Sequence, residues 1–336
     1  MQNLLDPAIL FFVFGVVAGA LRSNLEIPPA IAKFLSLYLL MALGLKGGFA
    51  LAQSGFNAAV LVSLLAAILM AFIVPVLGYQ FLKRRVAPFD AAAIAASYGS
   101  VSAVTFVTAM QHLESLSMSP GGHMAVALVI MESPAIVLAV LLANALRHGR
   151  TQQVSAADSG DAAVDSAEPP VAAAPVSKIL HESFTNGAHL LLLGAMVVGF
   201  LSGEAGKAVM APFSDDLFKG LLSFFLLDMG LMVARNFGSI RGKSPVLIAY
   251  ASLGPVVHAA IALLVSVLLQ LPVGDAALLM VLSASASYIV VPAVLRYAIP
   301  EANPSIYFGL SLGITFPLNI LVGIPLYSHV AALVLG

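Results

Sequence analysis

Long apolar segments, separated by short polar or charged turns, follow one another through nearly the whole chain. A helix needs about 20 mostly apolar residues to cross a bilayer, whereas the strands of an outer-membrane barrel are short and alternate between apolar and polar positions. The segments here are long and helical, so the pattern predicts an all-α integral membrane protein. Ten spanning helices are expected, at residues 7–21, 30–53, 57–82, 89–110, 121–146, 184–203, 213–234, 245–270, 274–298 and 303–335.

The composition excludes a soluble protein. Apolar residues make up 60% of the chain, charged residues make up 9%, and the mean hydropathy is +1.02. So few charges do not cover a soluble surface. The net charge of −1 argues against a nucleic-acid partner, and the chain has no cysteine to bind a soft metal. Neither a metal site nor a cofactor is expected.

One polar segment interrupts the apolar pattern between the fifth and sixth helices. Residues 149–178 are rich in Ala, Ser, Asp, Glu and Pro and bury too little apolar surface to order themselves, so a disordered linker is predicted. The linker separates a first five-helix unit, residues 1–148, from a second one, residues 179–336. Residues 7–21 are expected to be a spanning helix rather than a signal peptide, because no basic region precedes them.

The basic residues predict the orientation. Twelve of the fifteen follow odd-numbered helices, and Lys46, Lys207 and Lys219 fall on the other side. The twelve are Arg22, Lys33, Lys83, Arg84, Arg85, Arg147, Arg150, Lys178, Arg235, Arg241, Lys243 and Arg296. By the positive-inside rule the linker is cytoplasmic and both termini are outside, as expected for a multi-pass protein of a bacterial inner membrane.

The second unit enters the membrane in the opposite direction to the first, which predicts a 5+5 inverted repeat. Three pairs of segments match at a nearly constant offset along the chain, and they come from three different pairs of predicted helices. They are Leu40–Leu45 with Leu226–Leu231, Asp90–Ser102 with Asp275–Ser287, and Glu132–Pro134 with Thr315–Pro317. The second match superposes Ser100 on Ser285 and Ser102 on Ser287.

Two runs of alternating hydroxyl residues, Ser97–Thr105 and Ser283–Pro292, lie in segments that are otherwise apolar. Serines at a spacing of two point about 200° apart on a regular helix, so an unwound or half-helical backbone is expected if they are to converge. Packing of small residues is the alternative explanation. We expect the two runs to face each other across one binding site.

Three prolines are predicted to free backbone carbonyls near these runs. Pro134, Pro292 and Pro317 lack the N–H group that would bond the carbonyls of Ile130, Tyr288 and Gly313. Free carbonyls and hydroxyls suit a hard cation such as Na⁺, and the N-terminus of a half-helix favours an anion. A small anion coupled to Na⁺ is therefore the expected ligand pair.

Three ionisable residues inside predicted helices require an explanation, because each costs ~2.5–3.5 kcal/mol at mid-membrane. Glu132 is interpreted as part of a cation site or a proton relay, or else as a residue hydrogen-bonded to a neighbour. Lys46 and Asp228 lie in the matched second and seventh helices, at one depth if Leu40 is equivalent to Leu226, and a structural ion pair between them is predicted. No nucleophile–base or nucleotide-binding motif is present in the sequence, so neither an enzyme nor an ATP-driven pump is expected.

Several segments resemble the sodium-dependent bicarbonate transporters known from cyanobacteria. They are Gly44–Gly48, Gly99–Ser102 with Thr105, Met131–Pro134 followed by Ala143-Asn144, and Ile299–Ser305 preceded by Pro292–Arg296. The chain resembles a divergent member, since Tyr288 stands where the family has an aspartate. The resemblance implies core and scaffold domains, a homotrimer surrounded by membrane lipid, Na⁺-coupled bicarbonate uptake at the crossing of helices 4 and 9, and a PII-like cytoplasmic regulator.

These observations together define the expected site. The predicted substrate-binding residues are Gly99, Ser100, Ser102, Thr105, Ser285 and Ser287. The predicted Na⁺-binding residues are Glu132, Ser283, Tyr288 and Thr315. The expected function is secondary active transport of bicarbonate or a similar small anion by alternating access. A transporter of another small carboxylate, or a membrane receptor or regulatory scaffold that moves no solute, is the alternative.

Overall fold

The computed structural model describes residues 6–157, 187–240 and 242–336, and within them it contains helices and no strands. The α-helices are α1 (Pro7–Ala20), α2 (Pro29–Ser54), α3 (Ala58–Leu82), α4 (Pro88–Gly99), α5 (Ala103–Ser115), α6 (Met124–Ala157), α8 (Gly187–Ala211), α9 (Phe218–Asn236), α10 (Pro245–Leu268), α11 (Val273–Ala284), α12 (Val290–Ala298), α13 (Pro304–Leu310), α14 (Phe316–Leu318) and α15 (Ile324–Leu335). Short 3₁₀ or π-helical segments join some of them: η2 (Pro212–Asp216), η3 (Phe237–Ile240), η4 (Ser311–Thr315) and η5 (Asn319–Gly323).

Seven of the described helical runs are long and apolar enough to cross a membrane, and α1 and α11 are shorter apolar helices. The protein is therefore a multi-pass membrane protein. One of the seven runs, Gly187–Asn236, contains both α8 and α9, and another, Pro88–Ser115, contains both α4 and α5. Two expected spanning helices, 89–110 and 274–298, are each divided into two shorter helices.

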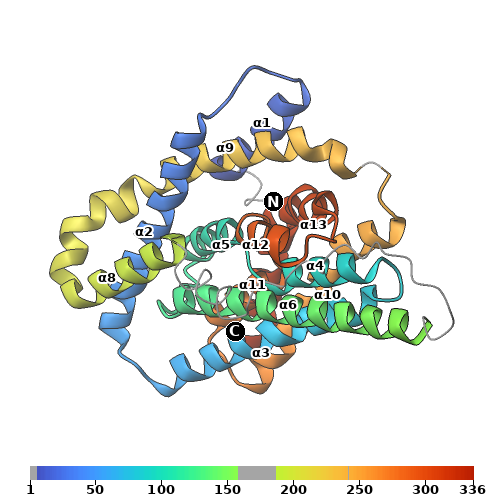
Figure 1. Ribbon diagram of the computed structural model, residues 1–336. Coiled ribbons are helices and arrows are strands. Elements are labelled where there is room, and N and C mark those ends of the chain that lie inside the picture. Colours follow the sequence, from blue (N-terminus) through green and yellow to red (C-terminus); the bar gives the residue numbers. More distant parts are fainter. Residues whose placement is uncertain (1–5, 158–186, 241) are drawn as a thin grey trace.

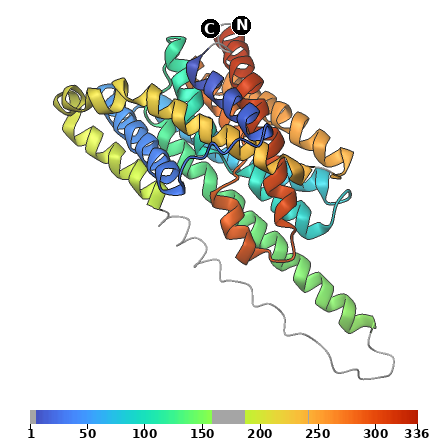
Figure 2. The same cartoon turned by 90° about the horizontal axis from the view of Figure 1, so that it is seen from above.

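The helices form two bodies, which lie side by side in Figure 1. We name them the four-helix layer, made of α1, α2, α8 and α9, and the central bundle, made of α3–α6 and α10–α15. Within the layer, α1 packs against α9 and α2 packs against α8. The helix α6 continues to Ala157, past residue 148 where the first unit was expected to end, and its last turns extend away from the bundle (Figure 2). The rest of the predicted linker, 158–178, lies outside the described residues.

Glycines allow the two helix pairs of the layer to cross closely, in the same way in both. A Cβ at Gly230 of α9 would overlap the carbonyl oxygen of Phe12 and lie 2.9 Å from the backbone N of Val16 in α1. A Cβ at Gly48 of α2 would overlap the carbonyl oxygen of Met196 and lie 2.7 Å from the backbone N of Phe200 in α8. Backbone atoms cannot turn aside as a side chain can, so both crossings require a residue without a Cβ.

This geometry changes the register expected for α2 and α9. The sequence match of Leu40–Leu45 with Leu226–Leu231 paired Gly44 with Gly230. The crossings instead pair Gly48 with Gly230, because these are the glycines that meet equivalent backbone atoms. The expected register was wrong by one helical turn, since an apolar Leu-rich pattern matches almost as well one turn away.

Candidate functional site

The first hydroxyl run breaks the helix that contains it. The helix α4 ends at Gly99, the backbone at Ser100 and Ser102 is extended, and α5 begins at Ala103. Ser102 is the N-cap of α5, and its Oγ accepts a hydrogen bond of 3.2 Å from the backbone N–H of Thr105. Serine favours this position because its side chain satisfies one of the N–H groups that the first turn leaves free.

The second run breaks its helix in the same manner. The helix α11 ends at Ala284, and α12 begins at Val290. The Ser287 Oγ accepts a hydrogen bond of 3.3 Å from the backbone N–H of Val291. The expectation that Pro292 frees the Tyr288 carbonyl from a continuous helix was wrong. Pro292 lies in the first turn of α12, where a backbone N–H group would have no carbonyl partner within the helix.

The two breaks meet and bond each other directly. The backbone N–H of Ser287 donates to the carbonyl oxygen of Ser97 at 2.8 Å. The backbone N–H of Ser102 donates to the Oγ of Ser285 at 3.0 Å, and that hydroxyl in turn donates to the carbonyl oxygen of Leu282 at 2.8 Å. The hydroxyl of Ser285 thus satisfies the backbone of the opposite run, whereas the hydroxyls of Ser102 and Ser287 cap the helices that follow in their own runs.

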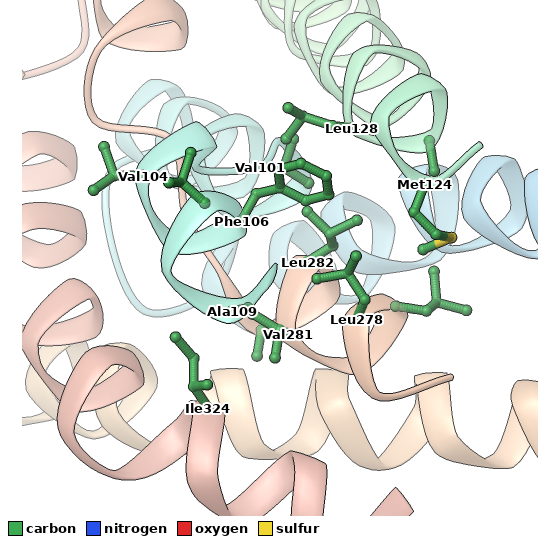
Figure 3. Close-up of a cluster of buried hydrophobic side chains, with 14 of the residues drawn as sticks. Val101, Val104, Phe106, Ala109, Met124, Leu128, Leu278, Val281, Leu282 and Ile324 are labelled. Atoms are coloured by element: carbon green, nitrogen blue, oxygen red, sulfur yellow. The ribbon is translucent and has the colours of Figure 1, made fainter. Parts of the chain in front are cut away.

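An apolar cluster holds the half-helices in place. Figure 3 shows Phe106 of α5 pointing toward Leu128 of α6 and Leu282 of α11, and all three side chains are at most 2% exposed. Because such a cluster packs at the density of a solid, the polar breaks beside it are held at fixed positions.

A small cavity lies where the breaks face the four-helix layer. Its volume is about 70 Å³, several times the ~10–15 Å³ that one water needs, so a solute of a few heavy atoms fits. The bundle contributes residues 101–104 of the first break, 287–290 of the second, and Leu128 and Glu132 of α6. The layer contributes Ser36, Leu40, Ala188 and His189. Four residues of the predicted site, Ser102, Ser287, Tyr288 and Glu132, therefore line one cavity.

A contact between a carboxylate and an imidazole joins the bundle to the layer at this cavity. The carboxylate of Glu132 contacts the Nε2 atom of His189, which is in the first turn of α8. The two side chains are only 6% and 9% exposed. A partner of this kind lowers the cost of burying a carboxyl group inside a membrane.

Removing the histidine is expected to destabilise the protein. His189→Leu leaves the Glu132 carboxylate buried without this partner, which for buried pairs costs ~3–5 kcal/mol. The melting temperature in detergent measures the effect. The double variant Glu132→Gln/His189→Leu carries no buried charge at this position, so it is expected to recover much of the loss. Equal melting temperatures for the His189 variant and the parent would contradict this contact.

The four predicted Na⁺-binding residues are divided between two places. Glu132 and Tyr288 line the cavity, whereas Ser283 and Thr315 do not. The Oγ1 of Thr315 donates to the carbonyl oxygen of Ala251 at 2.7 Å and also bonds the Tyr98 hydroxyl at 2.6 Å. That carbonyl is free because Pro255, one turn later in α10, has no N–H to give it.

Besides Ser285, three predicted substrate-binding residues lie at the breaks without lining the cavity. Gly99 packs on Pro75 of α3, whose ring would overlap a Cβ at this position, so its small size serves helix packing. Ser100 is buried, and its hydroxyl has no hydrogen-bond partner among the described residues; the hydroxyls of Ser97 and Ser283 share this property. Thr105 takes part through its backbone N–H.

The predicted ion pair between Lys46 and Asp228 was wrong. The Nζ of Lys46 lies 3.1 Å from Glu114 of α5 and 3.0 Å from Asp215 of η2, and 4.8 Å from the ring centroid of Phe218, the first residue of α9. Asp228 lies more than two turns after Phe218 in α9, which is about 15 Å along the helix at ~1.5 Å per residue.

Two residues of the site were missed in the sequence. His189 stands at the start of an apolar segment, where nothing in the local pattern separates it from an interfacial histidine. Tyr98 lies within the first hydroxyl run, yet only the folded structure brings it to Thr315. Among the described residues, no group of three or more His, Cys, Asp or Glu side chains is arranged to hold a metal ion.

Comparison with protein-family models matches residues 7–332 to the Na⁺-dependent bicarbonate transporter superfamily. A search of curated proteins gave no match. The matched range covers nearly the whole chain and includes both broken helices, and it confirms the resemblance seen in the sequence. Two broken helices that meet at a small cavity in a multi-pass membrane protein are a common feature of secondary transporters. The chain belongs to the Na⁺-dependent bicarbonate transporter superfamily.

Proposed function

We propose that the protein is a Na⁺-coupled secondary transporter that takes up bicarbonate, or a similar small anion, by alternating access. The observation that carries this proposal is the convergence of two half-helix N-termini on one cavity. The starts of α5 and α12, residues 101–104 and 287–290, both line it. The N-terminus of a helix carries free N–H groups and about half a positive charge, so two of them favour an anion.

The cavity also suits a small ligand that forms hydrogen bonds. Ser102 and Ser287 place hydroxyls at its wall, and the unpartnered hydroxyl of Ser100 lies in the same break. A buried polar group without a partner is rare, and bound water or a polar ligand is the usual explanation. Bicarbonate can both donate and accept hydrogen bonds at such groups, while much of the remaining wall, including Leu40, Val101 and Leu128, is apolar.

The cation site is proposed around Glu132. Its carboxylate lines the cavity together with Tyr288, so a bound Na⁺ would lie close to the anion and lower the cost of dehydrating it. Tyr288 offers a backbone carbonyl and a hydroxyl in place of a carboxylate. Its hydroxyl points to the Met229 sulfur of α9 at 3.8 Å, which adds a further contact between bundle and layer.

The inverted repeat is supported by contacts that recur in both halves. The Oδ1 of Asp90 accepts a 2.7 Å hydrogen bond from the backbone N–H of Asn303. The Oδ1 of Asp275 accepts one of the same length from the backbone N–H of Gly121. Asp90 and Asp275 are the first residues of the two matched hydroxyl segments, and each bonds the start of a helix in the other half. In each half, therefore, an aspartate bonds the backbone of the other half in the same way. The two glycine crossings of the layer are a second feature that both halves share.

The central bundle corresponds to the proposed moving core, and the four-helix layer corresponds to the scaffold. The proposed substrate-binding residues Ser102 and Ser287 lie on the bundle side of the cavity, and residues of the layer form the opposite side. Four points are carried over as proposals from the basic residues and from the family resemblance. They are the orientation with both termini outside, the homotrimer, the location in a bacterial inner membrane and the PII-like regulator.

Uptake into proteoliposomes tests the function. Radiolabelled bicarbonate is expected to accumulate with an inward Na⁺ gradient and to stop accumulating when the gradient is collapsed by an ionophore. Small carboxylates such as formate and acetate serve as competing anions. Transport of one of these carboxylates without bicarbonate uptake would show that bicarbonate is not the substrate. Anion binding without flux of any solute would overturn transport and favour a receptor.

A further inference from the structure

A large groove lies between α1 and α9 of the four-helix layer and part of the central bundle. Its volume is about 980 Å³, the upper end of the ~300–1,000 Å³ typical of small-molecule sites. One wall comes from α1 and α9, and the other comes from the π-helical region between α13 and α15. Most of the lining is apolar, including Phe12, Val13, Val16, Val17, Pro317 and Leu321.

Two arginines line this groove, and neither has an ion-pair partner in the part of the chain that the structure describes. Arg22 follows α1, and Arg235 lies in the last turn of α9. Among the described residues, no carboxylate is within ion-pair distance of either guanidinium, and Arg235 donates to the carbonyl oxygen of Leu25 at 2.9 Å. Both arginine side chains are exposed, so a ligand in the groove can reach them. An anionic group bound by both would offset their like charges.

The length of α1 places these arginines near the phosphate layer of the membrane. The helix has 14 residues, so it is about 21 Å long, against the ~30 Å thickness of the hydrocarbon core. A helix this short draws the lipid headgroups toward its ends or extends long side chains to reach them. Arginine is suited to the second role because its aliphatic stem lies on apolar surface while its guanidinium reaches a phosphate.

We propose that this groove binds one anionic phospholipid. The phosphate lies between Arg22 and Arg235, and an acyl chain follows the apolar wall formed by Phe12, Val16 and Leu321. Charge complementarity selects this occupant, since the groove joins two unpaired cations to an apolar channel. The lipid occupies the boundary between bundle and layer, where it would stabilise one relative position of the two bodies.

Lipid binding to the purified full chain tests this site. Native mass spectrometry in detergent is used to titrate phosphatidylglycerol and phosphatidylcholine with the same acyl chains. Tighter binding of phosphatidylglycerol is expected. Since a basic residue near the membrane contributes ~1 kcal/mol toward an anionic lipid, Arg22→Gln and Arg235→Gln are each expected to weaken binding about fivefold, and the double variant about 25-fold.

A second basic pair provides the matched control. Lys83 and Arg84 lie after α3, outside the groove, and Lys83→Gln/Arg84→Gln removes the same charge. This control is expected to bind phosphatidylglycerol as the parent does, and all variants should melt at the same temperature without lipid. Equal affinity for both lipids, or an equal loss in the control, would overturn the site. A double variant that changes oligomeric state while keeping its lipid affinity would show a subunit interface instead.

Discussion

Ser287→Ala is expected to lower the initial rate of Na⁺-dependent bicarbonate uptake about tenfold, and Ser102→Ala is expected to do the same. Each hydroxyl lines the cavity and caps a half-helix whose N–H groups face the proposed anion. Losing a hydrogen bond in a buried site costs ~1–3 kcal/mol, and ~1.4 kcal/mol is a factor of ten. Uptake at subsaturating bicarbonate, normalised to the amount of reconstituted protein, measures the effect.

Other buried serines control for a general effect on folding. Ser266 and Ser328 donate to the carbonyls one turn earlier in their own helices, at 2.7 Å in both cases, and neither lines the cavity. Their alanine variants are expected to transport like the parent. Ser287→Thr keeps the hydroxyl and should retain most of the activity. Normal uptake by both Ser102→Ala and Ser287→Ala would place the anion site elsewhere.

Gly230→Ala and Gly48→Ala are expected to lower the melting temperature and the folded yield. An alanine is normally better than a glycine inside a helix, by about 1 kcal/mol. At these two crossings, however, the added Cβ meets backbone atoms of the partner helix, and overpacking of this kind costs ~1–3 kcal/mol or more. The helices α1 and α9, or α2 and α8, would have to move apart along the whole crossing.

The control is a helical glycine in the same layer. Gly194 of α8 has open space where a Cβ would stand, so Gly194→Ala is expected to leave the melting temperature unchanged or to raise it. A Gly48 variant as stable as the Gly194 variant would mean that α2 and α8 cross at a different register. Gly44 is a further test, because a Cβ there would overlap the carbonyl oxygen of Leu192.

Part of the site could be predicted from local sequence. Serines at a spacing of two cannot share one face of a regular helix, and this conflict indicated an unwound backbone in both runs before any coordinates. The pairing of Ser102 with Ser287 followed from the internal match. The Pro292 prediction failed because a proline acts differently in the first turn than in the middle of a helix, and the sequence does not show where α12 begins.

The contacts of the charged residues required the folded chain. Lys46 of α2 lies between Glu114 of α5 and Asp215 of η2, and Glu132 of α6 meets His189 of α8, so every partner comes from a distant part of the sequence. Each of these pairs depends on how two helices pass each other. A shift of one turn moves a side chain by about 5.4 Å, which is more than the reach of an ion pair.

The sequence by itself determined the membrane class, the places where two helices break and the family, because these depend on apolar length, residue spacing and local motifs. The tertiary structure alone decided the helix register, the partners of the buried charges and the cavity that contains Ser102, Ser287 and Glu132. Apolar helix faces match almost equally well at several registers. The choice among them is made where a glycine allows two backbones to touch, and only the folded chain shows that contact.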